Sequence, residues 1–468
     1  MAGDLLAILS QASTSLGTHR AAAATASQNI ANVNTPGYSR QTANLEALTP
    51  TDFAGNAFIG RGVGLQSITQ ARDLFLERQV PGAISSKGFS STESDALGAV
   101  TALDPDGGDG LTSALGAFYA AMRGASQNPN DPGLRQAAVS AAQTLTRSFN
   151  RTAQALEDTR NGVDAKLAGT VNDVNQTAAA MADLNKQIRV ARASGGEPND
   201  LLDARQRLQD KLTQLTGAVP VANDKGDVSM ALPGGTTLVS DDRAATLSVT
   251  PDASNGGHLA LQLTRTDGSG PVTLPGTAVG GAMGGAISAR DGAVLAAKNG
   301  IDTLAFDLGN TINAIHSAGF AADGTTGHQM FTVAASAAGA ASSITVDAGL
   351  LANPSLLAAA SAPGASGDNR NLLAIINTER TALSTGNDAA TTFQGIVTSF
   401  GSAAQRSKAI ADQDVGIADH LNQLRESASG VSLDEEMINM TKAQRAFEAV
   451  SKVITATNDM LDTLMSLK

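Results

Sequence analysis

The hydrophobic pattern at both ends of the chain repeats in sevens. In the first 33 residues, apolar or small side chains recur at alternating steps of four and three, and the same spacing returns from Ala443 onwards. Such heptads are typical of helices that wind around each other in a left-handed coiled coil. We therefore expect the two ends to pair as long helices. The large residues of this predicted seam are Leu5, Leu9, Leu16, Ile30 and Val33, and Val450, Val453, Ile454, Leu461 and Leu464.

The middle of the chain continues in helical periods, with one exception. Residues 217–280 alternate short β-rich runs with Gly, Asp and Asn turns, which predicts a small β domain. A shorter β element is expected near 330–347. The whole pattern predicts a multidomain α+β fold that combines paired terminal helices, a helical bundle and an inserted β domain. Amphipathic helices are predicted over 134–156, 163–188, 201–215, 294–315 and 393–424.

These elements nest inside one another along the chain. Because the start and end of the β insertion are expected to lie close together, a short linker in its place should leave the bundle folded. The predicted domains are a terminal paired-helix domain at 1–34 plus 431–468, an extended loop segment at 35–90, a helical bundle at 91–216 plus 285–430, and an outward-facing β insertion at 217–284.

Polar residues mark two predicted helix starts. In the stretch EPNDLLDARQRLQDKL, Asn199 or Asp200 is expected to be the N-cap, because a side-chain oxygen there accepts hydrogen bonds from first-turn amides. The adjacent pair Glu435 and Glu436 is expected in the first turn of the last helix, where the helix dipole favours negative charge.

Composition narrows the classes of partner. The 468 residues carry a formal net charge of −12, which argues against nucleic acid, since binding to phosphates depends on Lys and Arg. The absence of Cys excludes disulfides, thiolate nucleophiles and cysteine zinc sites. No stretch has the composition of a transmembrane helix, and the first residues lack the basic and apolar regions of a secretory signal. We expect a soluble protein with no nucleic acid and no membrane among its partners.

No catalytic, cofactor-binding or metal-binding site is predicted. The five histidines are scattered without metal-ligand spacing, and the glycines at 60–64 lack the spacing of a dinucleotide loop. The stretch DPDGGDG at 104–110 lacks the ligands of a calcium loop and is expected to be a turn. One enzymatic alternative stays open, a hydrolase within the β insertion. That insertion has a single histidine, His258, and no nucleophile–base pair in its sequence, so we expect neither an enzyme nor a cofactor.

The stretch NIANVNTPGYSRQ at 29–41 is unusually rich in asparagine and contains one of only two tyrosines. Its asparagines can cap a helix, and Thr-Pro-Gly favours a turn, because Pro fixes φ and Gly accepts a positive φ. With the Ser-Gln before it, the stretch resembles the N-terminal signature of bacterial flagellar axial proteins, the family of rod, hook and hook-associated proteins. The candidate assembly motif consists of Asn29, Ile30, Ala31, Asn32, Thr35, Pro36, Gly37 and Tyr38.

Four other stretches support this resemblance. GRGVGLQSITQARDLFLERQ at 60–79, PNDLLDARQRLQDKL at 198–212 and GDNRNLLAII at 367–376 resemble segments of the hook-associated members. The block at 429–468 is similar to the C-terminal helix that rod, hook and hook-associated proteins share. The PNDLL and GDNRN blocks, with TPGYSRQ, favour a protein of the hook–filament junction. The hook protein and the other junction protein stay as alternatives.

The resemblance implies a structural adaptor that joins hook to filament. In this family the terminal helices form the inner tube of the flagellum, and variable domains face outward. Members of this family are exported unprocessed by the flagellar type III pathway, so the resemblance implies a chain that is cytoplasmic at first and extracellular afterwards. The implied partners are further copies of the chain, the hook protein, the second junction protein and an export chaperone. The candidate chaperone contacts are Leu433, Met437, Met440, Phe447, Val450, Ile454 and Leu461.

Overall fold

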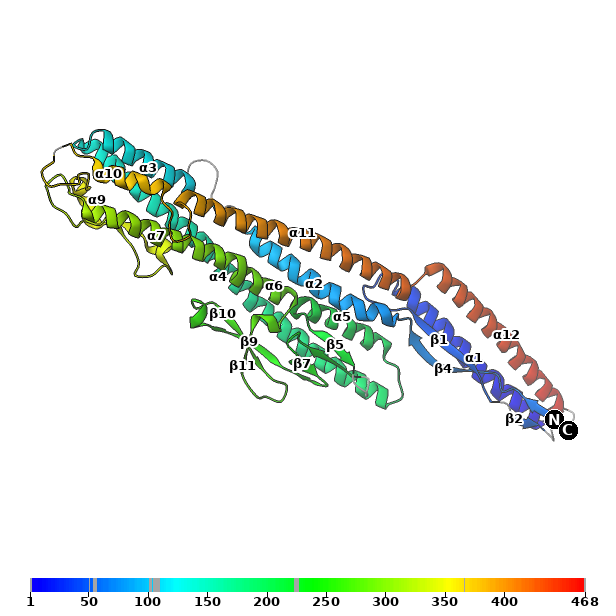
Figure 1. The fold of residues 1–468 in the computed structure, drawn as a ribbon. Coiled ribbons are helices and arrows are strands. Elements are labelled where there is room, and N and C mark those ends of the chain that lie inside the picture. Colours follow the sequence, from blue (N-terminus) through cyan, green and yellow to red (C-terminus); the bar gives the residue numbers. More distant parts are fainter. Residues whose placement is uncertain are drawn as a thin grey trace.

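The protein is a long rod with both chain ends at one tip (Figure 1). Two terminal helices form that tip, a body of long parallel-running helices forms the rest, and a small β region lies along one side of the body. The computed structural model describes residues 2–49, 51–53, 57–100, 103, 110–222, 227–365 and 367–466.

The terminal helices pair as the heptad pattern predicts. Helix α1 (Ala2–Ala31) packs along α12 (Leu433–Ser466), and the two run in opposite directions (Figure 1). A β-ribbon follows α1 and lies beside it, where Thr18 donates a hydrogen bond to the Val63 carbonyl at 3.1 Å. The ribbon consists of the antiparallel pairs β1 (Gln41–Ala47) with β4 (Val63–Gln70) and β2 (Thr51–Phe53) with β3 (Ala57–Ile59).

The predicted extended segment at 35–90 is wrong in its second half. Helix α2 (Leu74–Gly98) begins there and runs side by side with α11 (Ala389–Ser429). Asp73 caps α2 by accepting from the Phe75 amide at 2.8 Å. The helix is rich in Gly and Ser because its backbone packs closely against neighbours, and a Cβ at Gly88 would overlap the Gln214 carbonyl. Those small residues hide the helical period in the sequence.

The two helices predicted over 134–156 and 163–188 are one. Helix α4 (Pro132–Ala193) spans 62 residues, with Asp131 as its N-cap and Pro132 in its first turn. Gly162 does not interrupt it, because a helix-interior Gly costs only about 1 kcal/mol and side chains on both sides of it are buried. Helices α3 (Leu111–Gln127), α7 (Leu295–Ala318) and α10 (Arg370–Asn377) pack around the first half of α4 and enclose the main hydrophobic core.

The predicted β insertion is present, and its ends lie together. The Gly280 amide donates to the Thr216 carbonyl at 2.7 Å, and the insertion ends there because α6 (Gly281–Ala289) follows. One antiparallel sheet has the strand order β5 (Val219–Ala222), β6 (Val228–Ala231), β7 (Thr237–Ser240), β8 (Arg243–Ala244). The other has the order β11 (Val272–Leu274), β10 (Leu259–Thr264), β9 (Thr246–Pro251).

The insertion does not have a core of its own. Leu238, Val239 and Leu261 from its sheets share one buried cluster with Val174 and Met181 from the second half of α4. Removing the strands would leave that half of α4 with an uncovered apolar face. The structure therefore argues against the expectation that a linker can replace the insertion without loss to the helices.

The remaining elements are short, except for an 18-residue helix, α5. The β element predicted near 330–347 is confirmed as an antiparallel pair of two-residue strands. A π-helical turn joins α6 to α7 in one continuous helical run. These elements are β12 (Phe331–Thr332), β13 (Thr345–Val346), α5 (Asn199–Thr216), α8 (Ala340–Ser343), α9 (Ala348–Ala352) and the π turn Arg290–Val294.

Candidate functional site

Four segments meet where the terminal pair joins the body, and only the first two of them are neighbours in sequence. They are the end of α1, the segment 32–41 that leads into β1, the start of α5 and the start of α12. Three of the stretches that carry the family resemblance, at 29–41, 198–212 and 429–468, supply nearly all of the side chains. We call this place the junction.

Asn29 is the centre of the junction and is fully buried. Its amide nitrogen donates to the Gln41 carbonyl at 2.8 Å and to Glu436 Oε2 at 3.0 Å. Its oxygen accepts from the Gln41 amide at 3.0 Å and from the Tyr38 hydroxyl at 2.9 Å. These four bonds use both donors and both lone pairs of the side-chain amide. No other residue type of this size can make the same set.

Glu436 connects the start of α12 to the same point. Its side chain is only 2% exposed, and Oε1 lies 2.7 Å from Arg40 Nε while Oε2 accepts from Asn29. Arg40 also reaches Glu435, with Nη1 2.8 Å from Oε2. A buried carboxylate is costly without partners, and this one has a charged partner and an amide partner. The predicted place of this acidic pair in the first turn of α12 is confirmed, but Glu436 does more than complement the helix dipole.

Helix α5 contributes carboxylates to the junction instead of capping itself. Its first helical residue is Asn199, so the expectation that Asn199 or Asp200 is the N-cap is wrong. Asn199 donates to the Ile68 carbonyl at 2.9 Å, and Asp200 accepts from Gln41 Nε2 at 3.1 Å. Asp203 is buried and accepts from the Ser39 amide and hydroxyl at 3.0 and 2.8 Å. The body thus holds the segment that follows α1.

The TPGY stretch forms a turn on the surface of the junction. Gly37 has φ of +72°, so the predicted need for a positive φ is confirmed. A Cβ at Gly37 would lie 3.0 Å from Arg207 Cγ, because the Arg207 side chain covers the turn. Asn32 donates to the Gln28 carbonyl at 3.0 Å and accepts from the Thr35 hydroxyl at 3.2 Å. The other motif residues are Ile30, which is half-buried, and Ala31, Thr35 and Pro36, which are exposed.

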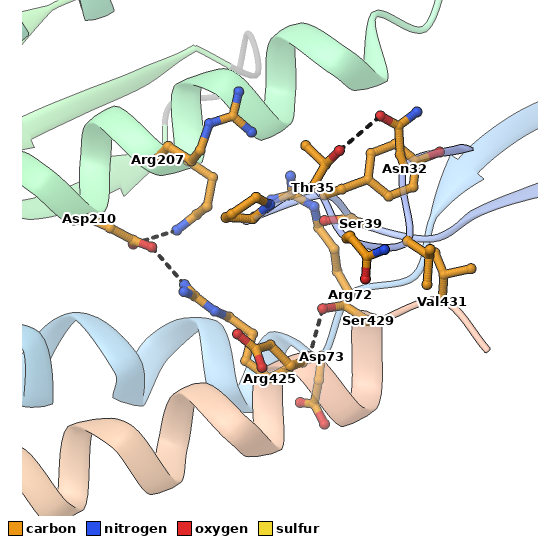
Figure 2. Close-up of a pocket in the computed structure, with 18 of the residues that line it drawn as sticks. Asn32, Thr35, Ser39, Arg72, Asp73, Arg207, Asp210, Arg425, Ser429 and Val431 are labelled. Carbon is orange, nitrogen blue, oxygen red and sulfur yellow. Dashed lines mark hydrogen bonds and ion pairs between the residues drawn. The ribbon is translucent and has the colours of Figure 1, made fainter. Parts of the chain in front are cut away.

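An open pocket of about 420 Å³ lies against this turn (Figure 2). Tyr38, Arg207 and Arg425 are among the residues that line it, and Arg425 Nη1, near the end of α11, lies 2.8 Å from Asp210 Oδ2. Burial, with the negative charges of Asp200, Asp203 and Glu436 added, raises the pKa of Tyr38 to about 12. The Tyr38 hydroxyl therefore stays protonated and remains a hydrogen-bond donor at physiological pH.

The junction is built to hold segments together. Its polar groups are hydrogen-bonded or ion-paired to each other, and no serine or threonine in it faces a free base. Sequence reasoning found Asn29 and Tyr38 but missed Arg40, Gln41 and Asp203 as members. The sequence could have indicated these three residues, because all of them lie in or beside the stretches that carry the family resemblance.

Most residues of the predicted seam are half-buried, and the helices that carry them pack along each other. Leu5, Leu9 and Leu16 of α1 are half-buried, as are Ile30 and Val33. Val453 is an exception, since 47% of its surface is exposed. The partly covered positions on α12 are Val450, Ile454, Leu461 and Leu464.

The candidate chaperone contacts do not form one surface in this structure. Leu433, Met437 and Phe447 are exposed, whereas the other four are half-buried, so a chaperone that used all seven would have to separate α12 from α1. The half-buried members are Met440, Val450, Ile454 and Leu461. These assignments stay predictions.

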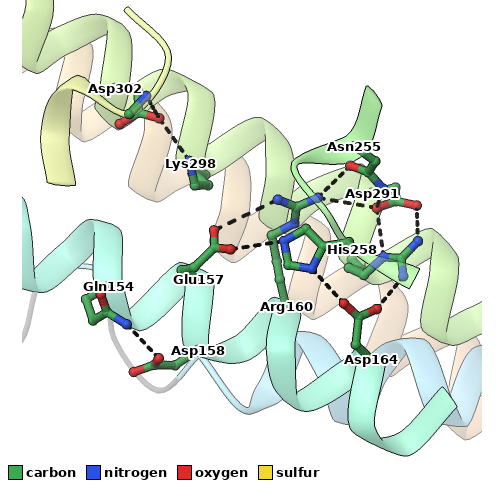
Figure 3. A network of polar contacts seen from close by, with 12 residues as sticks. Gln154, Glu157, Asp158, Arg160, Asp164, Asn255, His258, Asp291, Lys298 and Asp302 are labelled. Carbon is green, nitrogen blue, oxygen red and sulfur yellow. Dashed lines mark hydrogen bonds and ion pairs between the residues drawn. The ribbon is translucent and has the colours of Figure 1, made fainter. Parts of the chain in front are cut away.

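His258 of the β insertion lies in a buried polar network (Figure 3). Its Nδ1 is 2.7 Å from Asp164 Oδ2, and its Nε2 is 3.0 Å from Glu157 Oε1, both on α4. Arg290 from the π turn is ion-paired to Asp164, and Arg160 Nη2 lies 2.7 Å from Asn255 Oδ1. Both ring nitrogens of His258 face carboxylates, which leaves neither one to activate a nucleophile. The network fastens the insertion to α4.

Within the described ranges, no cluster of three or more His, Cys, Asp or Glu side chains has the geometry to hold a metal ion. Residues 104–109 of the DPDGGDG stretch lie outside those ranges, so the turn expected there stays untested. None of the helices in the described part of the chain combines the length and apolar character needed to cross a bilayer.

Comparisons with known proteins agree on one family. The family model described as "Flagellar hook-associated protein FlgK helical domain" matches residues 99–331, and the model described as "Flagellar basal body rod FlgEFG protein C-terminal" matches residues 423–467. Flagellar hook-associated protein 1 of Bacillus subtilis is 28% identical over 98% of this chain and 97% of its own length.

Two further relatives extend the comparison. Flagellar hook-associated protein 1 of Salmonella typhimurium is 29% identical over 70% of this chain and 59% of its own length. A solved structure of the flagellar hook junction protein FlgK from Burkholderia pseudomallei superimposes with a TM-score of 0.68 at 18% identity, over 76% of this chain and all of that one. The shared fold covers most of the rod.

Proposed function

Because the chain belongs to the flagellar hook-associated protein family, we propose that it is a structural adaptor of the hook–filament junction that assembles through its terminal helices. It forms a short zone of identical subunits, with the hook protein on one side and the second junction protein on the other. It acts without catalysis and without a cofactor. It reaches this extracellular position from the cytoplasm by type III export, accompanied by a chaperone at its C-terminal helix.

One observation carries this proposal, namely the uncovered apolar surface of the terminal pair. Met437, Ile438 and Met460 are each more than half exposed on α12, and Leu6 is 57% exposed on α1. Exposed apolar residues in such density along two paired helices are typical of surfaces that bind other proteins. In an assembly, neighbouring copies would cover them and supply the burial that one helix pair lacks.

The junction explains how such a pair can act mechanically. The hydrogen bond between buried Asn29 and Glu436 connects the two terminal helices, and Asp203 connects the segment 32–41, which follows α1, to the body. A force applied to the terminal pair therefore reaches the body through charged and hydrogen-bonded contacts, which have defined geometry. An adaptor between a bending hook and a stiff filament needs such a connection.

A deletion strain tests the proposal. Cells without the chain should carry hooks without filaments and release filament protein into the medium, and the full-length chain supplied in trans should restore filaments. The matched control is a chain with Val190→Ser, a change at an exposed position of α4 outside the terminal pair. Filaments of normal length on the deletion strain would contradict the adaptor role.

The alternative within the family is another axial protein. The match of residues 423–467 to a rod-protein C-terminal model is the observation that favours it, because that end is shared. The same strain separates the two, since loss of a hook protein would remove the hook itself.

A further inference from the structure

The stretch ARDLFLERQ contains two of the most exposed large apolar side chains of the described residues. Leu74 is 70% exposed and Phe75 is 67% exposed at the start of α2. They are adjacent and lie on the first turn, which Asp73 caps. We call this pair the knob. Nothing in the junction uses it, although Asp73 and Glu77 on either side of it line the junction pocket.

A groove of matching character lies farther along the rod. It has a volume of about 570 Å³ and runs between the start of α7 and the first turns of α11. Most of the side chains that line it are small or apolar, and Thr391, Thr392 and Ser399 add hydroxyl groups to the lining. The apolar walls consist of Ala293, Ala296, Ala297, Ile396, Phe400 and Ala403.

A copy cannot fill its own groove with its own knob. The knob lies beside Arg425 and Glu426 of α11, which share a pocket with Asp73 and Glu77, whereas the groove lies beside Phe400. Helix α11 is one continuous helix, so 25 residues at 1.5 Å each separate the two places by about 37 Å. An occupant with this chemistry must come from a second chain.

Charge complements shape at both places. Arg406 lines the groove and has no carboxylate partner among the residues that the structure describes. Asp73 stands directly before the knob and has no cationic partner in the same described set, because its Oδ1 only caps α2. A knob seated in the groove would bring an unpaired carboxylate to an unpaired guanidinium, which favours one orientation of the contact.

We propose that Leu74 and Phe75 of one copy insert into the α7–α11 groove of the next copy, with Asp73 paired to the partner's Arg406. This inference rests on the proposed self-assembly and names a contact for it. Knob and groove are different surfaces at different positions along the rod, so the contact is head-to-tail. A row of copies joined in this way has a free knob at one end and a free groove at the other. It generates a staggered helical array of rods, not a closed pair.

Cysteine crosslinking tests the contact, because the native chain has no Cys. Arg78 is exposed one turn after the knob on the same face of α2, and Ser399 is an exposed residue of the groove lining. The full-length Arg78→Cys, Ser399→Cys chain, isolated in flagella and treated with a short bismaleimide, should give covalent dimers and larger products. The control, Val190→Cys with Ser399→Cys, should give none. A double variant that stays uncrosslinked in flagella would overturn the contact and leave the adaptor role standing. Absence of the native chain from isolated flagella would overturn both.

A second measurement separates the contact from folding. Asp73→Asn keeps an N-cap side chain and removes the charge, and Arg406→Gln removes the opposite charge. Each should lower the crosslinking yield several-fold, and the double variant should lose little more than either one, because both remove one interaction. Fully additive losses would overturn the ion pair. Phe75→Ser should reduce the yield roughly tenfold, as loss of an aromatic anchor does, against no change for Val190→Ser.

Discussion

The terminal helix pair and the body of the rod bury different kinds of side chain. In the described part of α12 the buried residues are Glu436, Ala443 and Thr457, and those of α1 are likewise small or polar. The buried residues of α4 instead include Phe149 and Met181. Burial of one large apolar side chain contributes about 1.5–3 kcal/mol, and this is what stabilises an isolated fold.

The difference shows how one chain can combine a body that is stable as a monomer with a terminal pair that is fully buried only in an assembly. The body has two large buried apolar clusters, and burial of this kind stabilises a fold without neighbouring subunits. The terminal pair has polar contacts at the junction and leaves much of its apolar surface uncovered. Assembly would complete the second region without altering the first. Four measurements sharpen or break this contrast.

Hydrogen exchange on the purified monomer should show the largest difference. We expect fast exchange over about 1–33 and 440–468, because a single helix pair with little buried apolar surface is marginal in water. Amides between 134 and 215 should exchange at least about a thousandfold more slowly, as cores of stable domains do. Equal protection of both regions in a verified monomer would show that the terminal pair needs no neighbours.

Side-chain truncation should show the same contrast in free energy. Phe149→Ala removes a fully buried ring from the body and should lower the free energy of unfolding by about 3–5 kcal/mol. Ile454→Ala removes a half-buried side chain from α12 and should cost less than about 1 kcal/mol in the monomer. Urea unfolding measures both changes. Filament formation in the deletion strain should suffer from Ile454→Ala, and a monomer strongly destabilised by it would break the contrast.

The sequence predicted the regions with strong periodicity. The heptads identified both terminal helices, and the turn-rich run at 217–280 identified the insertion. The seam starts at Ala443, however, whereas α12 begins ten residues earlier, at Leu433. Helix α2 was missed because its Gly and Ser residues serve close backbone packing, which a periodicity argument does not register. The division of α4 into two helices failed for a related reason, since tertiary burial outweighs the cost of Gly162.

The candidate site was predicted only in part, because its partners are distant in sequence. The pattern around Gly37 predicted a turn with positive φ, which is a local property. The bond between Asn29 and Glu436 joins residues 407 positions apart, and no local rule places them together. The helix dipole alone accounts for an acidic residue at position 436, in the first turn of α12. Nothing in the sequence therefore indicated that Glu436 also binds Asn29.

A substitution in the turn should affect assembly more than folding. Gly37→Val puts a β-branched residue at φ of +72° and presses it against Arg207, so the turn must rearrange at a local cost of roughly 1–2 kcal/mol. The thermal transition of the body should move little, while motility should fall. Gly60→Val is the matched control, because a Cβ at Gly60 meets no neighbour. Normal motility with Val at position 37 would show that the turn is incidental.

The two tyrosines give the smallest but most direct readout, because one lies in the body and the other at its junction with the terminal pair. Burial raises the pKa of Tyr119, in the body, to about 12, and burial with nearby carboxylates raises that of Tyr38, at the junction, to about 12. A raised folded pKa means that each group's contribution to stability is present below pH 10 and is lost as pH rises from 10 through 12. With Tyr119→Phe, tyrosinate absorbance of the folded chain reports Tyr38 alone.

In the ordered junction, the absorbance of the Tyr119→Phe chain should rise near pH 12 and not near pH 10. The Tyr38→Phe chain, which reports Tyr119, is the control and should behave alike. Opening of the terminal pair in the monomer, if it extends to Asn29, would release the Tyr38 hydroxyl and remove its burial. Its titration would then move towards 10 while Tyr119 stays near 12. If only Tyr38 shifts, the opening of the terminal pair includes the junction. If neither tyrosine shifts, the junction stays closed, and the opening ends within α1, between Asn29 and the tip of the rod.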